Sequence, residues 1–300
     1  MVLVDFNGLA IGSIMGQLGR GQRIDLDAKQ LFSMRGEELN ENLVKHIILN
    51  NLRVYRNKYP ESEHGKMVIC CDSYSWRKDV FPEYKAKRKT NRAKDKHDWT
   101  MIFDLIEDTL KDLRENFPYA VIKVDGAEAD DIIGVLTKEA AQPLLGEDVV
   151  IISADKDFIQ LQVDGHVTQW SPLFNKMIKE DNPRRYLFDH ILKGDASDGV
   201  PNANSHDDVF LSEARQTPMT QKAINKYWDN RDDLEAIMKP NVYRNFMRNV
   251  QMIDLENTPE AMATEISFDY QTYKYPTRTN ILTYLVENRM KMLIECANEF

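Results

Sequence analysis

The chain has 300 residues, of which 42% are hydrophobic, 9% aromatic and 29% charged. This composition fits one large or two modest globular domains and excludes a mainly disordered protein. The 39 basic and 48 acidic residues give a net charge of −9 at pH 7, which on its own disfavours a nucleic-acid partner. No run approaches the roughly 20 apolar residues of a membrane helix, and the N terminus lacks signal-peptide features. We therefore expect a cytoplasmic protein without a membrane partner.

Short apolar runs alternate with helical patterns through the first 170 residues. Buried strands are predicted at residues 2–4, 67–70, 119–124 and 149–152. Apolar residues at helical spacing predict helices between them, over 38–56, 98–115 and 128–140. This alternation predicts an α/β fold with a twisted, mainly parallel sheet flanked by helices.

Helical patterns dominate the remainder of the chain. They occur at 184–193, 219–228 and 242–255, after a polar break at 179–183. We therefore predict two domains, an α/β domain over 1–180 and a smaller helical domain over 181–300.

Acidic side chains follow the predicted strands where each strand ends. Asp5, Asp72 and Asp155 come at the ends of three strands, and Asp157 follows two residues after Asp155. Further acids open the helix near residue 128 or lie in a glycine-bounded turn: Glu128, Asp130, Asp131, Asp195 and Asp198. The carboxyl ends of parallel strands share one edge of a sheet, so these groups are expected to cluster there. Taken singly, each acid is also explained as a helix cap.

Such a cluster of like charges would repel itself unless divalent cations lay within it. Carboxylate oxygens without cysteine or histidine favour Mg²⁺, with Mn²⁺ as a substitute. The six histidines form no metal-binding motif and are expected to be ordinary surface or core residues. Two Mg²⁺ ions could activate a water and stabilise the leaving oxygen in phosphodiester hydrolysis, so no side-chain nucleophile is needed.

A basic segment separates Asp72 from the helix near residue 98. Residues 77–96 carry nine basic and three acidic side chains, a local excess of positive charge in an acidic chain. Aromatic residues are interleaved with the bases: Tyr74, Trp76, Phe81 and Tyr84. This mixture suits contacts with phosphates and stacking on bases. The alternative is a solvated charged loop.

The chain resembles members of the flap endonuclease and 5′-nuclease superfamily over nearly its whole length, and it is most similar to the bacteriophage ribonuclease H branch. The resemblance rests on the order and spacing of several motifs: Leu3-Val-Asp-Phe6, Cys71-Asp72, Arg77-Lys-Asp-Val-Phe81, Tyr84 to Arg88, Glu128-Ala-Asp-Asp131, Ile152 to Phe158, Gln169 to Pro172, Lys193 to Asp198, and Asn298-Glu-Phe300. It implies a PIN-like 5′-nuclease core. It also implies 5′-to-3′ exonuclease, flap endonuclease and ribonuclease H activities, which remove RNA primers in lagging-strand replication.

The resemblance also assigns roles by position. The first metal site would hold Mg²⁺ with Asp5, Asp72, Glu128, Asp130 and Asp155. The second would use Asp157, Asp195 and Asp198, and Asp131 would act in an outer shell. Lys85 and Arg88, at the base of an arch over about 74–97, would face the scissile phosphate and act with Asp155 in catalysis. The DNA-binding set would be Arg77, Lys78, Tyr84, Lys85, Lys87, Arg88, Lys89 and Arg92.

The implied substrates are branched or nicked duplex DNA and RNA–DNA hybrids with a 5′ end. The protein would act as a monomer in the cytoplasm of an infected bacterium, with replication proteins such as a single-strand-binding protein as partners. The helical region would bind duplex DNA, although residues 200–208 lack the family's glycine-rich turn. Two other readings stay open, a PIN-like single-strand ribonuclease and a nucleic-acid-binding protein without catalysis.

Overall fold

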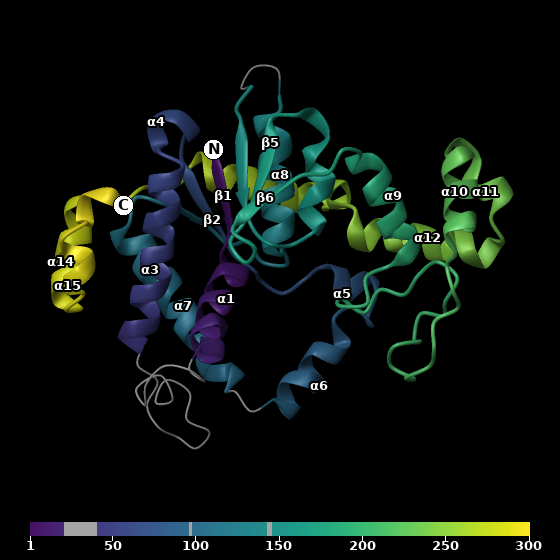
Figure 1. Ribbon diagram of the computed structural model, residues 1–300, viewed down its shortest axis with the longest axis horizontal. Coiled ribbons are helices and arrows are strands. Elements are labelled where there is room, and N and C mark those ends of the chain that lie inside the picture. Colours follow the sequence, from purple (N-terminus) through teal and green to yellow (C-terminus); the bar gives the residue numbers. More distant parts are fainter. Residues whose placement is uncertain (21–40, 96–97, 143–145) are drawn as a thin grey trace.

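A six-stranded sheet lies at the centre of the computed structural model, which describes residues 1–20, 41–95, 98–142 and 146–300 (Figure 1). The strand order is β3-β2-β1-β4-β5-β6. The strands are β1 (Val2–Asp5), β2 (Met67–Cys70), β3 (Ala120–Ile122), β4 (Val149–Ile152), β5 (Val167–Ser171) and β6 (Lys176–Ile178). Strands β1 to β5 pair in parallel, and β6 runs antiparallel to β5. The predicted mainly parallel sheet is confirmed, and β5 and β6 extend it beyond the predicted strands.

Helices cover both faces of the sheet because successive strand residues point to opposite sides. Val2 and Val4 pack into one core, with α1 (Phe6–Arg20), α3 (Glu41–Lys58) and α7 (Trp99–Asn116). Leu3 packs into the other, with α8 (Ala129–Ala140) and α13 (Glu260–Gln271). The beginning of the helix predicted over 38–56 lies outside the described residues. A short helix, α4 (Glu61–His64), leads into β2.

A third core joins the basic segment to the helical part. It contains residues of α9 (Pro183–Lys193), α10 (Gln221–Asp229) and α12 (Pro240–Ile253), and α11 (Leu234–Ile237) lies against it. Phe81 and Tyr84 contribute buried rings from the basic segment. The base of the predicted arch is thus fixed by packing against these helices, as expected for a segment that must hold its charges in place.

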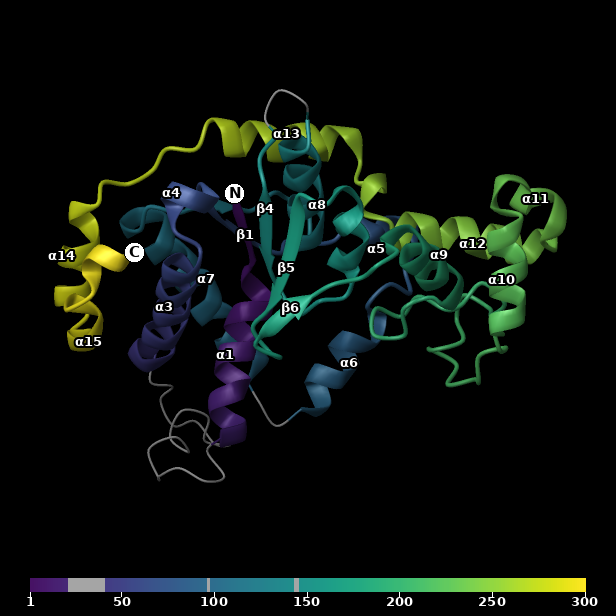
Figure 2. The same ribbon diagram turned by 45° about the horizontal axis from the view of Figure 1, so that its top comes forward.

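The C-terminal helices return across the molecule after α12. Helix α13 crosses one face of the sheet, and α14 (Thr279–Glu287) and α15 (Lys291–Ile294) lie at the end opposite α10 and α11 (Figures 1 and 2). Leu285 and Phe300 belong to the same core as β1. The helices after residue 181 therefore pack partly on one another and partly on the sheet, and the division into domains at 180/181 stays a prediction. No helix of the described ranges is long and apolar enough to cross a membrane.

Two short helices form the described part of the basic segment. They are α5 (Arg77–Val80) and α6 (Ala86–Lys94), and α6 lies below the sheet between α1 and the helical part (Figure 1). Lys85 precedes α6 in a left-handed backbone conformation, with φ of 54°. Its backbone N–H donates to the Asp198 carbonyl at 2.7 Å, which ties the base of α6 to the turn after α9.

Candidate active site

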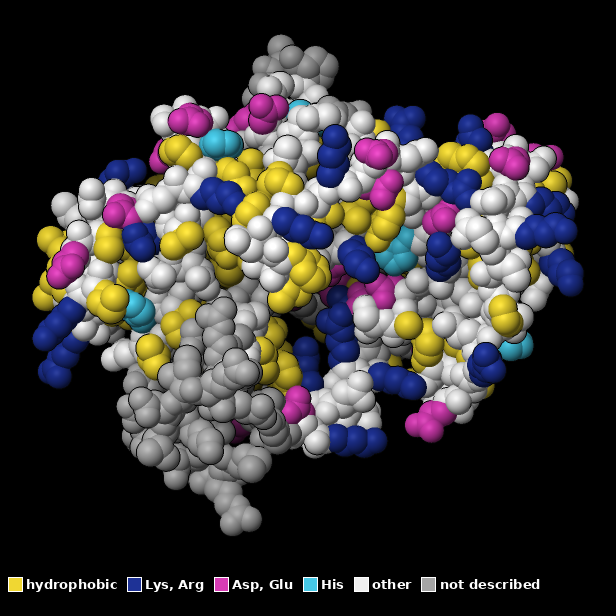
Figure 3. Space-filling model, viewed as in Figure 1, with side chains coloured by type: hydrophobic (Ala, Val, Ile, Leu, Met, Phe, Trp, Pro, Cys, Tyr) yellow, Lys and Arg dark blue, Asp and Glu magenta, His cyan; other side chains and the backbone are white. Residues whose placement is uncertain are grey.

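Acidic residues from separate strand ends border one open cleft. The cleft has a volume of about 1260 Å³, and its acidic lining includes Asp5, Asp155, Asp157 and Asp195. In Figure 3, acidic side chains and a histidine lie in a hollow at the centre of this face, with lysine and arginine side chains around it. These four acids therefore line one cleft, with Asp5 contributed by the end of β1, Asp195 by the turn after α9 and the other two by the segment that follows β4.

Asp5 is held rigidly where β1 meets α1. Its Oδ1 accepts from the Gly8 backbone N–H at 3.0 Å, and its Oδ2 accepts from the Ser153 hydroxyl at 2.8 Å. A Cβ at Gly8 would lie 2.5 Å from Asp5 Oδ2, so a larger residue there would displace the carboxylate. Burial, followed by repulsion from Asp72, raises the pKa of Asp5 to about 6.

Asp130 is buried among several carboxylates. Burial raises its pKa well above the ordinary value, and the nearby carboxylates of Asp155, Asp5 and Asp157 raise it further. A divalent cation would relieve this repulsion, and hard oxygen ligands are those that Mg²⁺ and Mn²⁺ accept. The chemistry of the donor set therefore fits a divalent-cation site at Asp5, Asp130 and Asp155.

Glu128 lies at the start of α8 and joins this acidic set to the basic segment. It forms a reciprocal capping box with Asp131, so the helix-cap explanation of these acids also holds. Its Oε2 accepts from Tyr84 at 2.8 Å, and its Oε1 is bound by the Lys85 ammonium. Burial acts to raise the pKa of Glu128, but the cations outweigh it and lower the pKa. Asp72 lies alongside, where it caps α8 by accepting from the Ala129 N–H at 2.8 Å.

Lys85 and Arg88, the predicted basic residues at the base of the arch, both form ion pairs with Asp198. Asp198 Oδ2 lies 3.3 Å from Lys85 Nζ and accepts from the Tyr84 hydroxyl at 3.0 Å, while Oδ1 pairs with Arg88. Burial of the Lys85 ammonium would lower its pKa, but Asp198 and Glu128 outweigh it and raise that pKa. Lys85 and Arg88 therefore carry positive charge directly beside the acidic cluster.

A histidine that was not predicted from the sequence lies within the second predicted acidic set. His190 lies between Asp157 and Asp195: its Nδ1 is 3.5 Å from Asp157 Oδ1, and its Nε2 is 3.8 Å from Asp195 Oδ2. Burial, followed by repulsion from Asp155, raises the pKa of Asp157 to about 7. No spacing rule flags His190, because only the packing of α9 against the loop after β4 brings it here.

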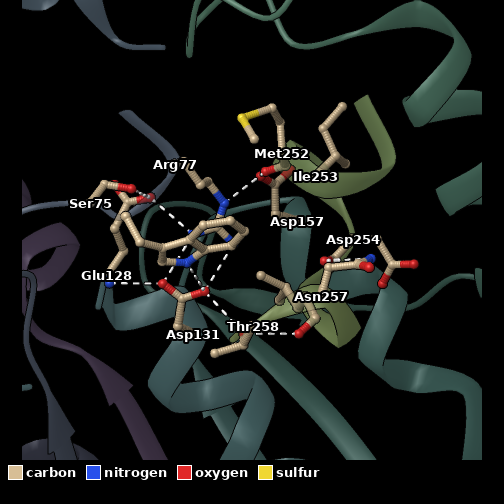
Figure 4. A network of polar contacts seen from close by, with 12 residues as sticks. Ser75, Arg77, Glu128, Asp131, Asp157, Met252, Ile253, Asp254, Asn257 and Thr258 are labelled. Atoms are coloured by element: carbon tan, nitrogen blue, oxygen red, sulfur yellow. Dashed lines mark hydrogen bonds and ion pairs between the residues drawn. The ribbon is translucent and has the colours of Figure 1, made fainter. Parts of the chain in front are cut away.

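Arg77 and Asp131 differ from their expected roles. Arg77 is only 2% exposed; it pairs with Asp131 at 2.9 Å and donates from Nε to the Met252 carbonyl at 2.9 Å (Figure 4). Asp131 is fully buried, and its oxygens also accept from Trp76, Thr258 and the Glu128 backbone N–H. An arginine in this position cannot reach a phosphate, and an aspartate so occupied has no lone pair left for a metal-bound water. Both instead hold α5, α8 and the end of α12 together.

Of the other predicted DNA-binding residues, all but Tyr84 lie on or near the surface. Lys87, Arg88 and Lys89 are exposed on α6. Arg92 is half-buried and lies over the rings of Trp99 and Phe103 at 5.1 and 4.8 Å. Lys78 is half-buried beside the Tyr74 ring, whereas Tyr84 is buried. Lys96, the last base of the predicted run, lies outside the described residues.

Replacement of Arg77 by lysine is expected to lower the free energy of unfolding by about 2 kcal/mol. Lysine keeps the charge but loses the Nε bond to Met252 and the forked contact with Asp131, and each charged hydrogen bond contributes about 1.5–3 kcal/mol. Urea denaturation would measure the change, with exposed Arg184→Lys as the control. Equal stability of the two variants would show that the buried network contributes nothing.

Without divalent cations, the protein is expected to become more stable as pH falls from 8 to about 5. The folded-state pKa values of Asp5 and Asp157, about 6 and 7, lie above the ordinary value of 3.8. Folded protein therefore binds protons in this window that unfolded protein does not, and its stability is lost as pH rises. Urea midpoints in EDTA would measure this, and Asp157→Asn should flatten the slope. A midpoint that rises with pH would contradict the proposed repulsion.

Comparisons with known proteins agree with this geometry. The family model described as the 5′-3′ exonuclease N-terminal resolvase-like domain matches residues 30–187, and that of the T4 RNase H C-terminal region matches 183–300. The ribonuclease H of Enterobacteria phage T4 is 31% identical over 272 residues, which cover 88% of each chain. A 5′-3′ exonuclease of Buchnera aphidicola (subsp. Schizaphis graminum) is 29% identical and matches 58% of this chain and 60% of its own length.

Two solved structures share the fold. The T5 5′-exonuclease with bound zinc has a TM-score of 0.59 at 14% identity, covering 91% of this chain and 98% of its own. The bacteriophage T5 D15 flap endonuclease, in a complex with DNA and metal ions, has a TM-score of 0.58 at 14% identity. The match covers 90% of this chain and 97% of that structure's chain. The PIN-like, resolvase-like architecture with a helical C-terminal part is therefore confirmed. Because one family model matches more than half of the chain and a 31% identical relative spans most of it, the chain belongs to the 5′-3′ exonuclease family of nucleases.

Proposed function

We propose that the protein is a Mg²⁺-dependent, structure-specific 5′ nuclease that removes RNA primers and cleaves 5′ flaps during lagging-strand replication. The observation that carries the proposal is the meeting of an acidic cluster with the positive base of the basic segment at Glu128 and Asp198. The named activities of its relatives, ribonuclease H and 5′-3′ exonuclease, support it. So does the fold shared with a flap endonuclease in complex with DNA and metal ions.

Two Mg²⁺ ions, replaceable by Mn²⁺, would supply an activated water and would stabilise charge on the scissile phosphate and the leaving oxygen. Asp5, Asp72, Glu128, Asp130 and Asp155 would hold one ion, and Asp157, Asp195 and Asp198 the other. Asp72, Asp155 and Asp195 each accept a hydrogen bond from a backbone N–H, so these three side chains would need little reorganisation on binding.

Lys85 and Arg88 would exchange their carboxylate partners for phosphate oxygens of the substrate. Their positive charge offsets the acidic set that a DNA strand would otherwise avoid, and the exposed bases of α6 would extend the contact along the backbone. Such contacts recognise phosphates and not bases, so the substrate would be defined by its shape. We propose branched or nicked duplex DNA and RNA–DNA hybrids with a 5′ end, cleaved by a monomer in the cytoplasm. A single-strand-binding protein is the proposed replication partner.

A cleavage assay tests the proposal directly. A 5′-flapped duplex and a nicked RNA–DNA hybrid should be cut from the 5′ end in Mg²⁺ but not in EDTA, whereas single-stranded RNA of the same sequence should be cut poorly. Preferential cutting of the single-stranded RNA would favour a single-strand ribonuclease. Binding of the flap without cleavage in either Mg²⁺ or Mn²⁺ would show a nucleic-acid-binding protein that has no activity.

Asp198→Asn is expected to slow flap cleavage by about tenfold and to raise the Mg²⁺ concentration needed for half-maximal rate. The change removes a carboxylate that would bind the second ion and that orients Lys85 and Arg88. Mg²⁺ titrations of single-turnover rates would measure both effects, with the exposed Asp208→Asn as the control. If the rate and the Mg²⁺ dependence stay unchanged, Asp198 has only a structural role in the turn after α9.

A further inference from the structure

His190 is the one non-acidic side chain in the candidate metal group formed by Asp157, His190 and Asp195 among the described residues. One potential ligand atom from each residue lies within 4.8 Å of the others. Two metal–ligand bonds of about 2.1 Å can span about 4 Å, so small side-chain rotations would bring all three onto one ion. The side chain of His190 is 16% exposed and lines the large cleft, so an ion could enter.

The backbone fixes this arrangement. Tyr186, Asp189, His190 and Lys193 line the cleft from one side of α9. The helix ends at Lys193 and is capped by Gly194, whose N–H donates to the His190 carbonyl at 2.8 Å. A Cβ at Gly194, which has φ of +67°, would lie 2.4 Å from the Val200 carbonyl oxygen. Only glycine fits at this position of the turn. The turn places the Asp195 carboxylate beside the His190 ring.

Asp195 has one oxygen engaged locally and the other directed at the histidine. Its Oδ1 accepts from the Ser197 N–H at 2.7 Å and the Ser197 hydroxyl at 2.6 Å, whereas Oδ2 is the atom nearest His190 Nε2. His190 therefore has a carboxylate beside each ring nitrogen. In metal sites, one imidazole nitrogen commonly binds the ion while the other donates to a carboxylate that orients the ring.

We propose that His190 supplies a nitrogen ligand to a divalent cation held with Asp157 and Asp195, and that this makes the position selective for Mn²⁺ over Mg²⁺. Mg²⁺ prefers oxygen ligands and keeps its waters, whereas divalent transition metals, a series that begins with Mn²⁺, bind sites that include nitrogen ligands with increasing affinity. The inference builds on the second cation position of the proposed function. The competing explanation is that His190 is a cationic partner of the two carboxylates, which a metal ion would displace.

Pulsed electron paramagnetic resonance of the full-length protein loaded with Mn²⁺ alone separates the two explanations. Wild-type protein should show modulation from a directly bound ¹⁴N nucleus, and labelling of histidine with ¹⁵N should change its frequency. His190→Gln should abolish the signal, whereas the control His206→Gln, on an exposed residue, should retain it. Absence of nitrogen coupling in Mn²⁺-saturated wild-type protein would overturn the proposal.

Metal affinity gives a second readout without cleavage. His190→Gln should weaken one Mn²⁺ site by about tenfold or more in calorimetric titrations, while Mg²⁺ affinity changes much less. An equal loss for both ions, or none for Mn²⁺, would contradict nitrogen ligation. Nitrogen coupling without flap cleavage in Mg²⁺ or Mn²⁺ would overturn the proposed function alone, and cleavage without nitrogen coupling would overturn this inference alone.

Discussion

Replacement of Asp155 by asparagine should reduce flap cleavage at least about a thousandfold and leave the fold intact. Asp155 is exposed in the segment that follows β4 and belongs to the acidic set proposed to bind the first ion. A metal ion contributes several kcal/mol of transition-state stabilisation, and about 1.4 kcal/mol corresponds to tenfold in rate. Loss of one charged ligand at the reacting phosphate therefore accounts for a change of this size.

The same substitution should not destabilise the protein in EDTA. The asparagine amide oxygen can still accept from the Asp157 N–H, which donates to Asp155 Oδ1 at 3.0 Å. Removal of the charge also relieves the repulsion that raises the pKa values of Asp130 and Asp157. The free energy of unfolding in EDTA is therefore expected to stay constant or to rise.

Single-turnover cleavage in saturating Mg²⁺ and urea denaturation in EDTA would measure the two effects. Glu180→Gln is a matched control, because Glu180 is an acid that lines the same cleft, accepts from the Asn182 backbone N–H and does not belong to the proposed metal ligands. Asp155→Asn at the wild-type rate would remove Asp155 from the metal site. Loss of activity together with collapse of the fold would show a structural role.

The sequence predicted those parts of the site that depend on local order along the chain. An aspartate that follows a buried parallel strand must lie at the carboxyl edge of the sheet, so Asp5 and Asp155 could be placed from spacing alone. Strand β5 was missed because two of its buried positions are polar, Gln169 and Ser171, and β6 was missed because it is short and has two exposed residues.

The interactions that could not be predicted join segments far apart in the chain. Arg77 belongs to a basic run, and composition alone places such a run in solvent or on DNA. Its partner Met252 is 175 residues away, so only the folded chain shows that Arg77 is interior. The same reason applies to His190 and Asp157, which meet through the packing of α9. The return of α14 and α15 to the sheet likewise depends on long-range packing.

Lys85→Ala should lower the single-turnover cleavage rate by about a hundredfold or more while weakening DNA affinity only slightly. In the structure, the Lys85 ammonium contacts Glu128 and Asp198, at the boundary between the acidic cluster and the basic segment. A cation at this position that contacts the scissile phosphate would interact more strongly as negative charge develops in the transition state, so its loss would affect rate more than binding.

Lys94→Ala should have the opposite effect. Lys94 is exposed at the end of α6, so it would be one of several exchangeable phosphate contacts, and its loss should weaken binding modestly and reduce the salt slope by up to about one unit. Two measurements would separate affinity from rate. DNA affinity would be measured in Ca²⁺, which suppresses cleavage, and the cleavage rate would be measured in single turnovers at saturating enzyme. The free energy of unfolding in EDTA would show whether Lys85→Ala acts only by destabilising the protein, through loss of the ion pair with Glu128. If both variants lose affinity equally and cleave normally once bound, the basic segment only attracts DNA, and Lys85 acts outside the catalytic site.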